Sequence, residues 1–516
     1  MTQLARNVAT TYVARFAIVC SGLFLFPFVT HHVGLSQYGL WLLVNGVTVF
    51  FLTADFGMGT SVVRYVAEAH AEEDIERMNG VVTSTFAFYL GLGVLAATLF
   101  AGSFALFWGA FNIPAADRGV AAQMIALVAI GQLLIGLPLG VFRQTLVGLQ
   151  RMDLVNAIML GQTVVRVGGV TAVVLAGRGI LGVVLVEVIA FILVGATSFV
   201  LCHRLRPGLS VDPRRVSLPL LRSMAPYSAQ VFVIGIAALA ILQTDDAIIS
   251  LFLPVAAVAI YGGAWRIYQV CRDVAEAVMG AVVPHATRAG AQGRRDVLRD
   301  IHVRWTKYSN AVLLSLAVPA IVFAEPVLVL WLGDRFAEAG VVAQILVAGM
   351  LLNNIHIVGT GLLTGLGRIS AYARYQIAWA VGNLVVSVAL VQWLGLPGVA
   401  LGSVIPLIAL EPLFVRAALR ELEQPARVFL GGALARPYAA ALMALPVLVL
   451  PTIALRPDTL APILGLSLLW FGVFAGCFAL IGLDARERGH LARLARRRTR
   501  RAARGLVPRV LGPGQS

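Results

Sequence analysis

Two arginines lie deep inside long apolar segments, where a charge costs several kcal/mol on insertion scales. With about 1.5 Å of helix per residue, Arg15 is about 12 Å from one end of its segment and Arg266 is about 15 Å from one end of the other. A guanidinium group at such a depth suits bidentate binding of phosphate or carboxylate. We therefore predict an anion-binding cavity that involves both arginines.

Helical spacing places further polar residues on the same faces as these two arginines. The predicted substrate contacts are Thr11, Arg15, Asn45, Arg266, Gln269 and Asn383. Asp273 and Glu276 share the face of Arg266, and Arg15 could instead form an ion pair with one of these two carboxylates. Both states are compatible with one protein, because an ion pair formed in one state can open to bind an anion in another. We therefore predict that Asp273 and Glu276 are gating or ion-pair residues.

Arg166 and Glu187 are expected to pair with each other. Arg166 precedes the turn at Gly177 by about eleven residues and Glu187 follows it by about ten, so an antiparallel hairpin brings them to one depth. We predict a structural ion pair. The neighbouring Asp245 and Asp246 mark the end of an apolar run and fit either a solvated helix end or a gate.

The segments that carry these residues are those of a membrane protein. The chain has 516 residues, 59% hydrophobic and only 13% charged, whereas soluble domains contain about 25% charged residues. Its mean hydropathy is +0.87. A bilayer-spanning helix needs about 20 mostly apolar residues, which predicts an all-α polytopic membrane protein with about 14 transmembrane helices. The runs are 7–30, 38–60, 79–108, 119–147, 154–176, 179–203, 219–244, 256–283, 305–332, 339–364, 370–393, 397–418, 432–455 and 460–483.

Basic residues predict the orientation of these spans, since they accumulate in short cytoplasmic loops. With a cytoplasmic N-terminus, 22 of the 40 basic residues fall in cytoplasmic loops, Arg143 among them, and only four fall on the other side. Both termini are therefore predicted to be cytoplasmic. The arginine-rich segment 486–516 fits a basic helix on anionic lipids and a disordered solubilising tail equally well.

An internal repeat predicts two lobes. Segment 146–151 (LVGLQR) resembles 363–368 (LTGLGR) at an offset of 217, and GILGVVL from Gly179 resembles GLPGVAL from Gly395 at an offset of 216. Such repeats place a transport site between two lobes. The predicted division is an N-lobe at 1–205, a basic linker at 206–218, a C-lobe at 219–420, two extra helices at 421–483 and a basic cytoplasmic tail at 484–516.

Signatures of catalysis are not found in the sequence. The only lysine, Lys307, follows no glycine-rich phosphate loop, and the adjacent His31 and His32 cannot face one metal as an i, i+4 pair would. We predict no catalytic residue, metal or cofactor. The net charge of +15 indicates contact with anionic membrane lipids and not nucleic-acid binding.

Three segments carry a resemblance to a known family. They are NVATTYVARFAIVCSGLFLFPFVTHHVGLSQYGLWLLV, TADFGMGTSVVRYVAE and QTDDAIISLFLPVAAVAIYGGAWRIYQV followed by Pro284. From about residue 6 to 420 the chain resembles the polysaccharide (O-antigen and exopolysaccharide) flippases of the multidrug/oligosaccharidyl-lipid/polysaccharide exporter superfamily. The resemblance implies two six-helix lobes around a central cavity, alternating access, and a cationic cavity that Arg15 and Arg266 fit. It also implies export of an undecaprenyl-pyrophosphate-linked oligosaccharide across a bacterial inner membrane, with a polysaccharide polymerase and ligase as partners.

Two other functions remain open. A multidrug/cation antiporter of the same superfamily would need lobe carboxylates that bind a proton or sodium ion, and Glu187 already has Arg166 as its neighbour. A membrane scaffold for polymer-assembly enzymes would depend on the basic tail. The denser arginine cluster expected of peptidoglycan-precursor flippases is not found, which disfavours that substrate.

Overall fold

The computed structural model describes residues 3–53, 55–107, 109, 111–368, 370–484 and 487–488. Within these ranges the side chains of residues 3–15, 107, 227, 230–231, 233–242, 277–281, 284, 291 and 370–371 are not described. The basic tail predicted at 484–516 thus lies almost wholly outside the described residues.

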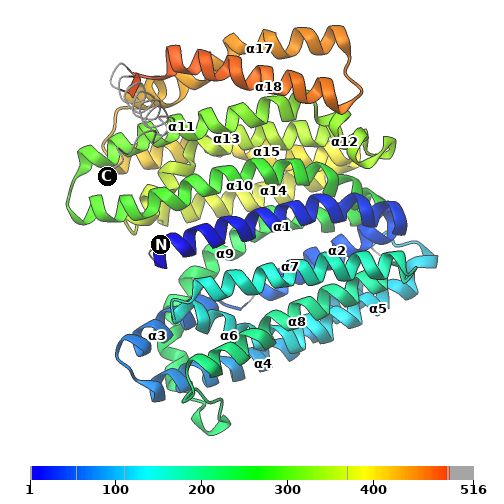
Figure 1. Cartoon of the computed structure of the whole chain (residues 1–516), viewed down its shortest axis with the longest axis vertical. Coiled ribbons are helices and arrows are strands. Elements are labelled where there is room, and N and C mark those ends of the chain that lie inside the picture. The colour runs from blue at the N-terminus through cyan, green and yellow to red at the C-terminus, as the bar shows by residue number, and fades with distance from the viewer. Residues whose placement is uncertain are drawn as a thin grey trace, which may run out of the picture. The chain divides into compact units, whose positions relative to one another are not determined.

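Every regular element in the described ranges is a helix (Figure 1). The helices of the first half are α1 (Gln3–Val33), α2 (Leu35–Thr53), α3 (Met58–Ala71), α4 (Ile75–Phe107), η1 (Ala115–Asp117), α5 (Arg118–Val128), η2 (Ala129–Gly136), α6 (Leu137–Gly148), α7 (Met152–Leu175) and α8 (Gly179–Leu205). Those of the second half are η3 (Pro213–Arg215), α9 (Leu218–Phe252), α10 (Ala256–Ala291), α11 (Arg295–Val322), α12 (Ala324–Leu332), η4 (Asp334–Phe336), α13 (Ala339–Gly365), α14 (Ser370–Leu394), α15 (Leu396–Glu421), α16 (Ala426–Phe429), η5 (Leu430–Ala435), α17 (Arg436–Leu455), α18 (Leu460–Cys477) and η6 (Phe478–Gly482).

Eleven helices in the described part of the chain are long and apolar enough to cross a membrane. The number becomes twelve if α11 and α12, which meet at a bend of 69°, form one span. The helices α9 and α10 have 35 and 36 residues, which is ample length for a span. The predicted fold class, an all-α polytopic membrane protein, is confirmed, and the total of 14 spans stays a prediction.

The helices group into two compact units. Unit 1 comprises Met1–Val270, Ala324–Gly349 and Ile369–Leu413, and unit 2 comprises Cys271–Phe323, Met350–Arg368 and Phe414–Ser516. The core of unit 1 joins the fully buried side chains of Leu40, Phe100 and Val258. In unit 2 the largest fully buried side chain is Trp470, whose indole N–H donates to the Ser315 carbonyl at 3.1 Å. The division into an N-lobe and a C-lobe stays a prediction.

The repeated sequence forms the same turn in both places. In segments 146–151 and 363–368 the last amide donates to the first carbonyl, at 3.0 and 2.9 Å, and the fifth amide donates to the second carbonyl, at 2.9 and 3.0 Å. These two hydrogen bonds together define a Schellman C-cap, which needs one residue in the left-handed region. Gln150 (φ 58°) fills that position in the first copy, and Gly367 (φ 70°) fills it in the second.

The end of the described chain is fixed to unit 2 by a buried ion pair. The Lys307 ammonium donates to both carboxylate oxygens of Glu487, at 2.8 and 2.6 Å. Only 2% of the Lys307 side chain and 10% of the Glu487 side chain are exposed. The Tyr308 hydroxyl and the Asp484 amide also donate to this carboxylate, each at 2.8 Å. Four donated hydrogen bonds therefore hold Glu487, and α11 carries three of them.

Candidate functional site

Arg266 lies in a polar cluster within unit 1. One of its guanidinium nitrogens donates to the Gln269 side-chain oxygen at 3.2 Å, one turn further along α10. The guanidinium carbon lies 5.8 Å from the centre of the Phe26 ring, which is cation–π range. Gly22 on α1 leaves room for it, because a Cβ at that position would lie 3.6 Å from an Arg266 nitrogen. In the part of the chain that the structure describes, Arg266 has no ion pair within 4 Å, and its other polar neighbours are Tyr38 and Asp246.

Asp245 and Asp246 lie within α9, which continues to Phe252 and so does not end at these residues as the sequence predicted. Asp246 lies within electrostatic reach of Arg266 and approaches α2 at Gly46, where an added Cβ would lie 3.2 Å from its Oδ2 atom. Asp245 is only 2% exposed, and its carboxylate accepts a hydrogen bond from the Tyr261 hydroxyl at 2.5 Å. Asp245 is therefore part of the packed interior and not a solvated helix end, one of the two interpretations left open by the sequence.

Arg166 and Glu187 are paired, with 2.5 Å between Arg166 Nε and Glu187 Oε1. The pair joins α7 to α8, which lie side by side (Figure 1). Tyr38, near the start of α2, lies within electrostatic reach of this pair and of Arg266. Arg166, which is paired, and Arg266, which has no ion pair among the described residues, therefore belong to one connected region of unit 1.

Two other predicted substrate contacts, Asn383 and Asn45, differ in how far they are buried. Asn383 is fully buried; its amide nitrogen donates to Ser403 Oγ at 2.7 Å, and its oxygen accepts from Thr244 Oγ1 at 3.3 Å. A glycan would have to break these bonds to reach Asn383. Asn45 is half-buried on α2, next to Gly46.

Four predicted residues have no described place in the Arg266 cluster. The side chains of Thr11 and Arg15 lie outside the described residues. Backbone spacing on α1 alone places Arg15 seven residues, about 10 Å, from Gly22. Asp273 and Glu276 belong to unit 2, where Glu276 pairs with Arg272 at 2.7 Å.

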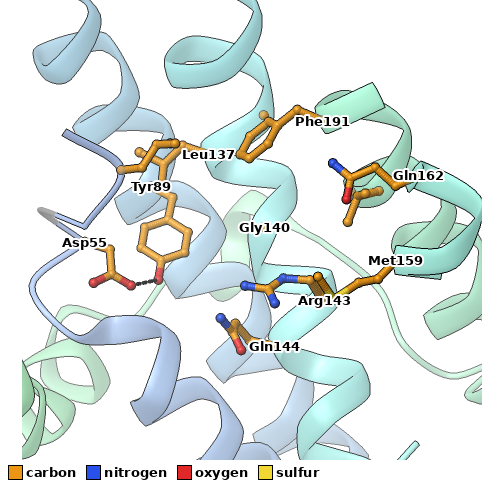
Figure 2. A pocket seen from close by; sticks show the side chains of 13 residues that line it. Asp55, Tyr89, Leu137, Gly140, Arg143, Gln144, Met159, Gln162 and Phe191 are labelled. Atoms are coloured by element: carbon orange, nitrogen blue, oxygen red, sulfur yellow. Dashed lines mark hydrogen bonds between the residues drawn. The ribbon is translucent and has the colours of Figure 1, made fainter. Parts of the chain in front are cut away.

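A second polar region of unit 1 surrounds Asp55, at the break between α2 and α3. Phe56 and Gly57 have positive φ values there, 54° and 73°, so the chain turns sharply. The Asp55 carboxylate fixes this turn, since it accepts hydrogen bonds from the amides of Gly57 (2.8 Å) and Gly59 (3.1 Å). It also accepts from the Tyr89 hydroxyl of α4 at 3.0 Å (Figure 2). Asp55 therefore has a structural role, because its three hydrogen bonds hold the turn and join it to α4.

Beside Asp55 is a cavity of about 390 Å³ that the sequence did not predict. Arg143 enters it from α6, and Figure 2 shows its guanidinium pointing toward Tyr89 and Gln144. The assignment of Arg143 to a cytoplasmic loop is wrong, because α6 continues to Gly148 and keeps the side chain within the helical bundle. The one available signal was that Arg143 falls inside the predicted span 119–147.

Comparison with solved structures identifies the fold. The inward-facing structure of a multidrug resistance MATE family transporter of the MOP superfamily matches with a TM-score of 0.66 and 15% identity, over 80% of this chain and 94% of the other. The inward closed structure of the lipid II flippase MurJ matches with a TM-score of 0.68 and 13% identity, over 92% of this chain and 98% of the other. The protein therefore has the membrane fold shared by the MATE transporter and MurJ.

The sequence identifies the family within this fold. Residues 4–289 match the model of the polysaccharide biosynthesis protein family, and the chain belongs to that family. A probable low-salt glycan biosynthesis flippase, Agl15 of Haloferax volcanii, is 25% identical over 201 residues. That match covers 38% of this chain and 41% of the relative. The resemblance to polysaccharide flippases inferred from the three segments is confirmed at the level of the family.

Proposed function

We propose that the protein is a flippase, not an enzyme, of cell-surface polysaccharide biosynthesis. It moves an undecaprenyl-pyrophosphate-linked oligosaccharide from the cytoplasmic to the outer leaflet of a bacterial inner membrane by alternating access of two lobes, 1–205 and 219–420. Both termini are cytoplasmic, and a polysaccharide polymerase and ligase use the exported glycan. Family membership and the name of the Haloferax volcanii relative support this function.

The state of Arg266 carries the proposal. It is a half-buried arginine inside a long helix, hydrogen-bonded to a neutral amide and without an ion pair among the described residues. Maintaining such a charge is costly, and a diphosphate is a suitable partner because it accepts two parallel bonds from a guanidinium. Arg15, on the face of α1 that contains Gly22, supplies the second charge. The polar residues Thr11, Asn45 and Gln269 admit the sugar.

The test is charge reversal. Arg266→Glu should reduce export of the glycan lipid at least tenfold, since a hydrogen bond to a charged group contributes about 1.5–3 kcal/mol and reversal adds repulsion. Arg15→Glu should act likewise, and Arg266→Lys should retain part of the activity. Arg335→Glu is the matched control, because Arg335 is exposed at η4 of the same unit. Surface polymer is measured beside the amount of folded protein.

The outcomes separate this function from its rivals. Normal polymer in both the Arg15→Glu and the Arg266→Glu variant refutes the flippase assignment. Native mass spectrometry of the gently solubilised protein should reveal a polyprenyl-diphosphate sugar that the double Arg15→Ala/Arg266→Ala variant loses. Saturable binding of an organic cation in its place would indicate an antiporter. Complete loss of activity on deletion of 486–516 would indicate a scaffold, whereas a flippase is only weakened.

A further inference from the structure

Two hollows adjoin within unit 1. The first is the cavity of about 390 Å³ beside Asp55, and the second is a groove of about 380 Å³ between α7 and α8. They share the lining residues Gln162 and Val194, so the two hollows meet at these two side chains. Each volume alone falls in the range of about 300–1,000 Å³ typical of ligand sites.

The cavity beside Asp55 suits an anion. Arg143 carries a full charge there, and among the described residues it has neither a hydrogen bond nor an ion pair. Two neutral amides, Gln144 and Gln162, line the same space and add hydrogen-bond donors. The negative charge of Asp55 lies at one side of the same cavity, where its carboxylate oxygens are held by the Gly57 and Gly59 amides and the Tyr89 hydroxyl, so an anion has to bind on the side of Gln144 and Gln162.

The groove suits a hydrocarbon chain. Its lining is almost entirely apolar, with Leu154, Ile158, Val165, Leu193 and Leu201 along its length. Val165 and Leu193 are 40% and 44% exposed, and in a membrane such apolar side chains face lipid tails. A polar cavity that contains Arg143 thus adjoins an apolar groove, and an amphiphile with an anionic head would complement both.

The depth of Arg143 fits a lipid headgroup. Arg143 is five residues from Gly148, the last residue of α6, which corresponds to about 7.5 Å along the helix. The guanidinium lies in the cavity (Figure 2), so a phosphate bound to it would lie within about one and a half turns of the end of α6. The adjoining turn contains Arg151, ion-paired with Asp153 at 3.0 Å, as is usual for chain at a membrane surface.

We propose that this composite site binds one anionic glycerophospholipid of the bilayer. Its phosphate lies at Arg143 with Gln144 and Gln162, and one acyl chain lies in the groove between α7 and α8. The site is separate from the cluster around Arg266 and does not depend on the identity of the transported glycan.

The test measures binding of phosphatidylglycerol to the delipidated full chain by native mass spectrometry in detergent. Arg143→Gln should weaken binding of the first lipid about tenfold or more, as expected for loss of charge-assisted hydrogen bonds. Gly161→Leu should weaken it as well by filling the groove, since no atom lies within 4 Å of a Cβ at that position. The second variant leaves the arginine in place, so the proposal stays testable if Arg143→Gln misfolds.

Two matched controls make the result specific. The first control is Gly168→Leu. Gly168 lies two helical turns beyond Gly161 on α7, lines neither hollow and, like Gly161, has no atom within 4 Å of an added Cβ. Arg151→Gln removes a paired arginine near the same end of α6. Both should bind phosphatidylglycerol within twofold of the wild type.

Three outcomes overturn the proposal. The first is equal affinity of wild type, Arg143→Gln and Gly161→Leu. The second is equal binding of neutral phosphatidylcholine and phosphatidylglycerol. The third is tighter, Arg143-dependent binding of farnesyl phosphate than of phosphatidylglycerol, which would assign the site to a polyprenyl carrier. Because Arg266→Glu is tested by export, failure here leaves the proposed flippase function intact.

Discussion

Replacing Lys307 with methionine should destabilise unit 2 by removing one half of its buried ion pair. Deleting one partner of such a pair costs about 3–5 kcal/mol. For Lys307→Met we expect about 2–3 kcal/mol, because Tyr308 and the Asp484 amide still donate to Glu487. Glu487→Leu should cost about 3–5 kcal/mol, since it leaves a charged ammonium on a side chain only 2% exposed.

The double variant Lys307→Met/Glu487→Leu should cost less than either single change. It removes both charges and fills their space with apolar groups, which is close to neutral for many buried pairs. The free energy of unfolding is measured by titrating dodecyl sulfate into mixed micelles and following tryptophan fluorescence. Trp470, buried against α11, reports on the same unit.

An exposed pair on the same helix provides the control. Arg304 and Asp300 lie one turn apart at 2.7 Å, with side chains 51% and 53% exposed, and Arg304→Met should cost less than about 1 kcal/mol. The reasoning is refuted if the double variant costs the sum of the two single changes. It is also refuted if Lys307→Met is more costly than Glu487→Leu.

Three shorter predictions use the same unfolding assay. Burial, together with the nearby Arg206, lowers the pKa of His70. The unfolded chain therefore binds the proton first, and the free energy of unfolding should fall as the pH drops below about 6.5. His70→Gln should flatten this dependence on pH. Gln150 and Gly367 both have positive φ, which favours glycine. Gln150→Gly should therefore raise the free energy of unfolding by about 0.5–1 kcal/mol, and Gly367→Gln should lower it by a similar amount. Effects of equal sign in the two variants would contradict this. Tyr89→Phe should cost about 1.5–3 kcal/mol through its bond to Asp55, and no measurable loss would show that this bond is not needed.

Local sequence patterns predicted the elements well. A run of about 20 apolar residues forms a helix in a bilayer, so the fold class follows from composition. The hairpin count from Gly177 was enough to bring Arg166 opposite Glu187, since both distances are measured along helices of known rise. The repeat matched 146–151 with 363–368, and the structure adds that both segments form the same Schellman cap, which is a local structure.

The sequence did not predict which distant helices pack against one another. The cavity beside Asp55 combines residues from α2, α4, α6, α7 and α8, and periodicity says which face a residue occupies but not which helix packs against it. The place of Arg143 inside the span 119–147 was readable from the sequence, but its neighbours in the cavity were not. Asn383 was expected to meet sugar for the same reason: its face was predictable, but its partners Ser403 and Thr244 were not.

The buried lysine has a practical consequence for labelling chemistry. Lys307 is the only lysine of the sequence, and an α-amino group has a pKa of about 7.7–8.0, well below the value near 10.4 of an ordinary lysine. An amine-reactive dye added near pH 7 therefore modifies the α-amino group first. A second dye at higher pH then reacts with Lys307 only in molecules whose Glu487 segment has detached from α11. One wild-type protein, without any engineered cysteine, thus carries its own single-site probe for release of the segment that precedes the basic tail.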